Sequence, residues 1–202
     1  MAAIPISRYL GAMRIVAVAK LPDHAKGSDF SFWIDAQIKP PFDATPFVTE
    51  PIPARQKAYG LDDDLFSLHD GKDTALFVAE DGGTIAGYVA LSRGWTGCAH
   101  VNDIAIACAY RRQGIATALL DQASAWARME QLPALRLETQ STNLAACQLY
   151  RRYGFELGGY DGLLYRELGD AVVTDVALFW YLRLPSDADG HMPAETGQIA
   201  EN

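Results

Sequence analysis

Two arginines and a glycine stand immediately before a helical run in CAYRRQGIATALLDQA, residues 108–123. A strand, a short turn, a glycine and a helix in this order direct the unpaired N–H groups of the first helical turn, and the positive end of the helix dipole, at one point. That point suits a phosphate, and Gly114 and Ala116 leave room for such a ligand near the backbone. Arg111 and Arg112 add positive charge in a chain whose formal net charge is −8. The segment therefore predicts a phosphate-binding turn, with a purely structural turn as the alternative.

The same segment lacks the features of two common nucleotide-binding loops. It has no GK[ST] sequence, which a Walker loop requires, and it lacks the three glycines of the dinucleotide-binding pattern. The segment instead resembles the acetyl-CoA loop of the GCN5-related N-acetyltransferases, Q/R-x-x-G-x-G/A, which reads here as Arg111-x-x-Gly114-x-Ala116. The surrounding sequence makes the resemblance specific, because VNDIAIACAYRRQGIATALL is similar to the family's strand–loop–helix unit. Downstream, NLAACQLYRRYGF is similar to the family's N-x-x-A-x-x-x-Y-x-x-x-G-F unit.

The resemblance extends to one group within this family, the streptothricin acetyltransferases. LETQSTNLAACQLYRRYGF, GGYDGLLY and ALFWYLRL are similar to segments of that group. The match is strong over residues 74–184 and looser before them. It implies transfer of an acetyl group from acetyl-CoA to an amine of a cationic small molecule, with the β-lysine moiety of streptothricin as the family's precedent.

The resemblance also implies which residues hold acetyl-CoA. Backbone groups of Ile104–Ile106 would pair with the pantetheine arm, and the amides of residues 111–116 would hold the pyrophosphate with help from the Thr117 hydroxyl. Asn143 stands where the family hydrogen-bonds the pantetheine, and a plain helix N-cap is the alternative. The full set expected to contact acetyl-CoA is Ile104, Ala105, Ile106, Arg111, Arg112, Gln113, Gly114, Ile115, Ala116, Thr117, Asn143 and Tyr150.

Two residues are expected to carry the chemistry. Tyr150 stands where the family places a tyrosine facing the acetyl-CoA sulfur, and a phenol can give a proton or a hydrogen bond to the leaving thiolate. Asp103 matches the acidic strand position that some members use as general base, since the attacking amine must first lose a proton. A structural role for Tyr150 on the apolar face of its helix, and anchoring of the substrate by Asp103, are the alternatives.

Other acidic and aromatic residues are expected to contact the substrate. Glu138, on a neighbouring strand by family topology, is expected to share this task. The run Asp62–Asp64, followed by Asp70, is interpreted either as a funnel for a cationic substrate or as a solvated loop. Trp95 and Tyr160 are expected to line the pocket, with core packing as the alternative. The full set expected on the substrate side is Asp103, Glu138, Trp95, Tyr160, Asp62, Asp63 and Asp64.

Composition limits the class of protein. The chain has 202 residues, of which 50% are hydrophobic and 21% charged, enough for one domain with a sizeable core. Its pI of about 4.9 argues against a general nucleic-acid binder and favours cationic partners. Three cysteines without paired spacing argue against a disulfide framework or a structural zinc site, and the four histidines show no metal-ligand spacing. We expect a cytoplasmic protein with reduced thiols, no metal and no membrane segment, as a monomer or homodimer.

Periodicity and turn residues predict one α/β domain. The expected fold is a single GNAT-type domain over residues 1–184, with a mixed, largely antiparallel, twisted sheet flanked by helices, and residues 185–202 are expected to form a polar, mobile tail. The expected strands are 13–19, 30–38, 74–81, 84–92, 100–107, 134–140, 155–166 and 175–184. The expected helices run from about 114 to 130 and, after a cap within 141–143, to about 153. The proline-rich residues 40–53 are expected to hold little regular structure.

These features predict an acetyl-CoA-dependent N-acetyltransferase. We expect direct transfer in a ternary complex with a cationic amine, because the sequence places no nucleophile for an acyl-enzyme. Two alternatives stay open. The substrate can be another amine, such as an aminoglycoside, a polyamine or a protein lysine, or the chain can be a non-catalytic acyl-CoA-binding module.

Overall fold

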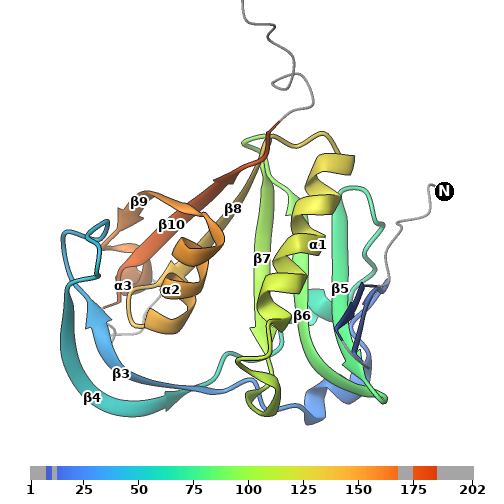
Figure 1. Cartoon of the computed structure of the whole chain (residues 1–202), viewed down its shortest axis with the longest axis horizontal. Helices are drawn as coiled ribbons and strands as arrows, with labels where there is room; N and C mark the ends of the chain where they lie inside the picture. Colours follow the sequence, from blue (N-terminus) through green and yellow to red (C-terminus); the bar gives the residue numbers. More distant parts are fainter. Residues whose placement is uncertain (1–7, 11–12, 168–174, 186–202) are drawn as a thin grey trace, which may run out of the picture.

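An eight-stranded sheet and a separate two-stranded ribbon form the framework of the molecule (Figure 1). The computed structural model describes residues 8–10, 13–167 and 175–185, so most of the expected tail lies outside the described residues. The strands are β1 (Arg8–Leu10), β2 (Met13–Ala17), β3 (Phe32–Ile38), β4 (Thr49–Lys57), β5 (Thr74–Asp81), β6 (Thr84–Arg93), β7 (Ala99–Ile106), β8 (Ala134–Gln140), β9 (Glu156–Asp161) and β10 (Ala177–Arg183). The helices are α1 (Ile115–Met129), α2 (Leu144–Tyr153) and α3 (Leu164–Glu167), with short 3-10 turns η1 (Asp23–Gly27), η2 (Asp63–Phe66) and η3 (Cys108–Tyr110). The mixed, largely antiparallel α/β fold that the sequence predicts is confirmed.

The sheet has the order β1-β2-β5-β6-β7-β8-β10-β9, and β7 and β8 are its parallel pair. A parallel pair needs a crossover connection, which α1 provides. The β7–β8 ladder holds for three residue pairs, from Ala99↔Leu135 to Val101↔Leu137. Beyond Val101, β7 keeps its partner β6 on one side and has no ladder with β8 on the other. The two halves of the sheet therefore diverge below this contact, as Figure 1 shows.

Both long helices pack on one face of the sheet, and a second apolar cluster lies on the other. Residues of α1, α2 and the strands beneath them form one core cluster, in which Leu119, Trp126 and Leu137 are buried. The other cluster joins η1 and η2 to the back of β5 and β6, with Leu65 and Tyr88 buried in it. The diverging sheet thus separates a helix face from a face covered by 3-10 turns.

The two predicted helices are confirmed together with their end signals. Gly114 precedes α1 in the left-handed conformation, at φ +81°. The Asn143 side chain caps α2 by accepting a hydrogen bond from the Ala146 amide at 3.2 Å, and Gly154 ends it at φ +111°. The buried stripe of α1 begins at Ile115, and Ala116 beside it is half-buried.

Two expectations about strands are wrong. The proline-rich region is not irregular throughout, because β4 includes Pro51 and Pro53. These prolines are tolerated since β4 pairs with β3 alone and the register shifts between Ile34 and Ala36, opposite Arg55 and Pro51. The strand expected over 155–166 stops with β9 at Asp161, whose carboxylate accepts hydrogen bonds from the amides of residues 163 and 164 and turns the chain into α3.

Arg151 fastens the connection between β3 and β4 onto α2. Its guanidinium donates to the carbonyl oxygens of Ala44 at 2.6 Å and Phe42 at 3.4 Å. The same group lies over the Phe47 ring, 3.4 Å from the ring centre. These contacts therefore tie the β3–β4 connection to α2.

We predict that Arg151→Met lowers the free energy of unfolding by about 1–3 kcal/mol, since it removes charge-assisted hydrogen bonds and leaves two carbonyl groups without their donors. Arg152→Met is the matched control, because the neighbouring arginine is exposed and should change stability by no more than about 0.5 kcal/mol. Urea unfolding of both variants measures the difference. Equal stability of the two variants would show that the Arg151 contacts hold nothing in place.

Candidate active site

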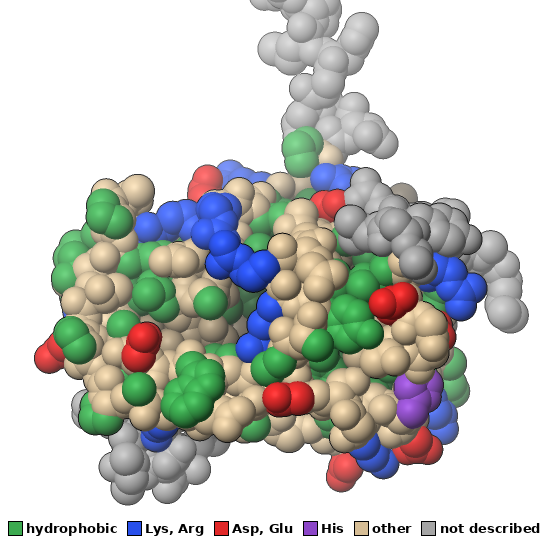
Figure 2. All heavy atoms as spheres, turned by 60° about the horizontal axis from the view of Figure 1, so that its bottom comes forward, with side chains coloured by type: hydrophobic (Ala, Val, Ile, Leu, Met, Phe, Trp, Pro, Cys, Tyr) green, Lys and Arg blue, Asp and Glu red, His purple; other side chains and the backbone are tan. Residues whose placement is uncertain are grey.

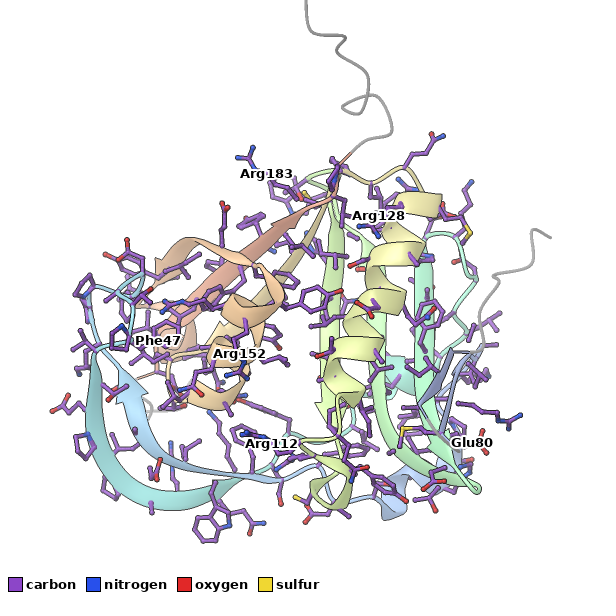
Figure 3. The ribbon with its side chains drawn as sticks, in the orientation of Figure 1. Phe47, Glu80, Arg112, Arg128, Arg152 and Arg183 are labelled. Atoms are coloured by element: carbon purple, nitrogen blue, oxygen red, sulfur yellow. The ribbon has the colours of Figure 1, made fainter. Side chains whose placement is uncertain are left out.

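The start of α1 is open to a ligand. A Cβ atom built on Gly114 would meet nothing within 4 Å, and Arg112 before it is exposed in the left-handed conformation, at φ +63°. The Ala118 amide is bonded to the Gly114 carbonyl at 3.0 Å, so the amides of Ile115 to Thr117 precede the first intrahelical bond. Lys and Arg side chains gather on the face that carries this helix start (Figure 2), and Arg112 and Arg152 lie in the region between α1 and α2 (Figure 3). The geometry fits the predicted pyrophosphate position.

Arg111 has a different task from its neighbour. Its guanidinium donates to the carbonyl oxygens of Ile106 at 3.1 Å, Phe30 at 3.1 Å and Ser31 at 2.6 Å. These bonds commit its charge to the backbone, so the exposed positive charge at the helix start comes from Arg112. Arg111 instead ties the loop before α1 to residues 30 and 31 on the other face of the sheet.

The free edge of β7 leads from the start of α1 toward the centre of the molecule. Ile104–Ile106 pair with β6 on one side, while their other side faces away from any β8 ladder. Backbone N–H and C=O groups on such an edge can pair with the amides of an extended ligand, as an added strand would. Acetyl-CoA has two amides in its pantetheine arm and a pyrophosphate beyond it, so the edge and the helix start fit different parts of one molecule.

We call the divergence of β7 and β8 the opening. Tyr150 lies on its helix side. Its side chain is 5% exposed and packs against Phe155 and Trp180, with ring centres 5.7 and 6.3 Å away. Among the described residues, its hydroxyl has no hydrogen-bond partner. Burial raises the pKa of Tyr150, and the charges of Cys147 and Asp103 raise it further. The phenol is therefore protonated near neutral pH and free to donate.

Asp103 lies on the opposite face because of a bulge in β7. Ala90 pairs with Asp103 and Leu91 with Val101, so Asn102 is an extra residue in the strand. Val101 belongs to the helix-side cluster, and the bulge turns Asp103 to the other side, where Tyr88 lies. The Tyr88 hydroxyl donates to Asp103 Oδ2 at 2.5 Å.

The charge state of Asp103 reflects two opposing effects. Burial raises the pKa of its carboxyl, and the hydrogen bond from Tyr88 lowers it. The Asp62 carboxylate also raises the pKa of Asp103. A partly desolvated carboxylate of this kind can accept a proton from an ammonium group.

Glu138 lies on the same face as Asp103, on the far side of the opening. Leu135 and Leu137 of β8 face the helices, so Glu138 faces away from them and accepts a hydrogen bond from the Tyr165 hydroxyl. Burial raises the pKa of Glu138. Two residues further along β8, Gln140 accepts hydrogen bonds from Tyr59 and Lys57.

Lys57 does not leave a free positive charge in this acidic site. Its ammonium pairs with Asp175 at 3.0 Å, and the Asp175 side chain is fully buried. Asp175 also accepts a hydrogen bond from the Thr142 amide at 3.1 Å. The ion pair thus joins the end of β4 to the turn before α2 and holds Tyr59, two residues after Lys57, beside β8.

Sequence reasoning missed the residues that surround the two carboxylates. Tyr88 lies in the apolar sequence of β6, where an aromatic residue is expected to belong to the core. Only the hydrogen bond of its hydroxyl to Asp103 links it to the site. Tyr59 and Lys57 lie in the segment where the resemblance is loose. Tyr165 lies where a strand was expected, although its place in GGYDGLLY, one of the segments that carry the resemblance, was a usable signal.

The structure leaves three expected substrate contacts outside this arrangement. Trp95 is 94% exposed in the turn between β6 and β7, at the end of β7 remote from the start of α1. Tyr160 lies opposite Leu178 on the helix side of the sheet and stacks with Phe42 at 4.8 Å, so it is on the other face from Glu138. Asp64 is exposed within η2 and makes no side-chain hydrogen bond or ion pair with a described residue.

Asp70 has a structural task rather than a place in a funnel. Its Oδ1 atom accepts hydrogen bonds from the amides of Lys72, Asp73 and Thr74 at 2.9–3.0 Å, which shapes the turn before β5. These bonds lower the pKa of Asp70.

The described residues contain no group of three His, Cys, Asp or Glu side chains that could hold a metal ion. No helix among them is long and apolar enough to cross a membrane.

Comparison with known proteins identifies the family. Residues 40–155 match the model of the acetyltransferase (GNAT) family, which covers more than half of the chain. The chain belongs to the acetyltransferase (GNAT) family. It is therefore an acetyl-CoA-dependent N-acetyltransferase, and the alternative of a non-catalytic module is set aside.

Relatives within the family agree in sequence and in structure. The chain is 35% identical over 125 residues to streptothricin acetyltransferase A of Bacillus subtilis (strain 168). The matched region covers 60% of this chain and 70% of the relative. It is 33% identical over 133 residues to an Escherichia coli streptothricin acetyltransferase, and this match covers 66% of the chain and 73% of the relative. A Bacillus anthracis str. Ames protein assigned as a streptothricin acetyltransferase, solved with acetyl coenzyme A, superimposes with a TM-score of 0.73 at 26% identity over 88% of this chain and 100% of that chain. Nourseothricin acetyltransferase superimposes with a TM-score of 0.70 at 30% identity, over 86% of this chain and 99% of that chain.

We predict that Gly114→Val weakens CoA binding at least about tenfold, because a branched side chain would occupy the space that the pyrophosphate needs. Gly97→Val is a matched control for backbone strain, since Gly97 has φ +80° and an equally open Cβ position in the β6–β7 turn. Both variants should lose about 1–2 kcal/mol of stability to the left-handed conformation, while only Gly114→Val loses affinity. Calorimetry with CoA measures this. Unchanged affinity in folded Gly114→Val would contradict the assignment of the helix start to the phosphate.

Proposed function

We propose that this protein acetylates an amine of streptothricin by direct transfer from acetyl-CoA within a ternary complex. One observation carries the proposal: Asp103, held by Tyr88, lies with Glu138 on the face opposite the helices, at the divergence of β7 and β8. Two carboxylates and several phenols suit a substrate that carries more than one ammonium group. The names of the similar proteins support the same substrate.

Asp103 is the proposed general base. An ammonium group has no lone pair, so the carboxylate must take one proton before the nitrogen can attack the thioester carbonyl. Burial raises the pKa of Asp103 toward neutral pH, and a carboxylate with a higher pKa is a better proton acceptor. Glu138, on the other side of the opening, is the proposed anchor that orients the substrate.

Tyr150 is the proposed general acid. Acetyl-CoA supplies the acetyl group as a thioester, and when the C–S bond breaks the sulfur carries the electron pair away as a thiolate. The protonated Tyr150 hydroxyl, without a partner among the described residues, is available to donate to that sulfur. The attacking nitrogen loses a second proton as the amide forms, which replaces the proton that Tyr150 gave to the sulfur. The proton on Asp103 passes to solvent, so the net products are an amide, a thiol and one proton.

The cysteines give no support to an acyl-enzyme route. Cys147 is fully buried, and burial raises its pKa to about 12, which keeps it as an unreactive thiol at neutral pH. Cys108 is exposed, and its thiol donates to the Ser31 carbonyl at 2.9 Å. Direct attack of the amine needs neither residue.

The cytoplasmic location and the choice between monomer and homodimer stay predictions.

A panel of amines tests the proposed substrate. Purified protein, acetyl-CoA and a thiol reagent are combined in turn with streptothricin, an aminoglycoside, spermidine and a lysine-containing peptide. We expect streptothricin to give the highest kcat/KM. Preferential acetylation of any other amine would overturn the substrate while leaving the family assignment intact.

We predict that Tyr150→Phe lowers kcat about tenfold or more, because general acid assistance is typically worth ~10²–10⁴-fold, and that the affinity for acetyl-CoA changes little. Tyr153→Phe is the matched control on the same helix, since its hydroxyl donates to Asp121 at 2.8 Å. Rapid-quench measurement of the chemical step separates the two variants. Wild-type chemistry in Tyr150→Phe would return this residue to a structural role.

We predict that Tyr88→Phe moves the acidic limb of the kcat/KM profile to higher pH. The lost hydrogen bond stabilised ionised Asp103, so the pKa of Asp103 rises and less of the base form is present at a given acidic pH. Activity should fall about tenfold on the acidic limb, the value of one charge-assisted hydrogen bond, and approach that of the wild type at alkaline pH. An equal loss at every pH would indicate that Tyr88 only packs the core.

A further inference from the structure

A cavity of about 410 Å³ lies on the face of the sheet that carries Asp103, between η1, the end of β4 and η2. We call it the η1–η2 hollow. The residues of its lining that bear on ligand binding are Lys26, Asp29, Phe30, Tyr59, Asp63 and Phe66. None of these is among the residues that the sequence assigned to acetyl-CoA, and Asp63 is the only one expected on the substrate side.

The η1–η2 hollow adjoins the two carboxylates of the candidate active site. The Phe30 ring meets the Tyr88 ring edge-on, with centres 5.3 Å apart, and the Tyr88 hydroxyl donates to Asp103. From the other wall, the Tyr59 hydroxyl donates to Gln140, two residues along β8 from Glu138. A ligand whose amine reaches Asp103 would therefore extend past these shared rings into the hollow.

The lining suits a cation. Carboxylates of Asp29 and Asp63 stand among the rings of Phe30, Tyr59 and Phe66, and aromatic faces with nearby carboxylates attract ammonium groups. The one basic residue of the lining, Lys26, is already paired with Asp23 at 3.0 Å and lies over the Phe66 ring at 4.5 Å. Asp63 forms no ion pair or side-chain hydrogen bond with any described residue.

The floor of the η1–η2 hollow is fixed before any ligand arrives. The Ser28 hydroxyl donates to the Ile85 carbonyl at 2.9 Å, and the Ser31 amide donates to Asp29 at the same distance. Arg111 holds the carbonyl groups of Phe30 and Ser31, as described above. A preorganised floor lowers the ordering cost of binding.

We propose that the η1–η2 hollow binds a second ammonium group of the substrate while Asp103 holds the amine that is acetylated. The inference rests on the proposed function, because it takes Asp103 as the reacting position. It separates two neighbours of the acidic run: Asp63, which lines the hollow, contacts the second cation, whereas Asp64 lies outside the lining. The site therefore selects molecules with two or more cations over single amines of equal length.

The experiment compares straight-chain diamines, from diaminopropane to diaminododecane, with the n-alkylamines of the same chain lengths. Calorimetry on CoA-loaded protein measures their affinities without any turnover. We expect the best diamine to bind the wild type about tenfold more tightly than its matched monoamine. Asp63→Asn should remove most of that preference. Asp64→Asn makes the same change of charge one residue away, and should reduce the preference by less than half as much.

Each outcome bears on one claim. Equal affinities of diamines and monoamines in the wild type, or equal effects of Asp63→Asn and Asp64→Asn, would overturn the second-cation site. Thiol release with streptothricin is measured on the same preparations. Its absence from the wild type would overturn the proposed substrate, and the calorimetric comparison would still decide whether the η1–η2 hollow selects for two cations.

Discussion

The short parallel ladder between β7 and β8 is the constraint on which the site depends. Three residue pairs, ending at Val101↔Leu137, join the two halves of the sheet, and the strands then separate. Continuous pairing would use the free edge of Ile104–Ile106 and leave none of its backbone groups for a ligand. The divergence leaves backbone groups on one strand for an extended ligand, and in the proposed mechanism Tyr150 acts from the helix face and Asp103 from the other face.

Two local features fit the surrounding structure to this opening. The bulge at Asn102 reverses the side to which β7 presents its residues, so Val101 stays in the helix-side core while Asp103 faces the substrate side. Arg111 then connects the loop before α1 with the floor of the η1–η2 hollow through backbone carbonyls. The half-buried guanidinium of Arg111 thereby joins the two faces on which we propose that the two substrates bind.

Local signals in the sequence were sufficient for α1, α2 and the ranges of the strands around them. Glycine at a left-handed position, an asparagine cap and alternating strands act over a few residues, and the family resemblance supplied Asp103, Glu138 and Tyr150. The course of β4 was not predictable in this way, because its prolines are tolerated only through a one-sided pairing with a shifted register. Likewise, the contact of Tyr88 with Asp103 depends on a bulge in a neighbouring strand, which no local pattern in β6 encodes.

Direct transfer between two substrates that meet at the β7–β8 divergence is the central claim, and isotope labelling tests it most directly. The protein is mixed with acetyl-CoA labelled in the acetyl group, without an amine, and then precipitated; a second sample receives streptothricin in the same single turnover. We expect no label on the protein in the first sample and quantitative label on streptothricin in the second. Label that remains on the protein near one equivalent, and then passes to streptothricin, would contradict direct transfer.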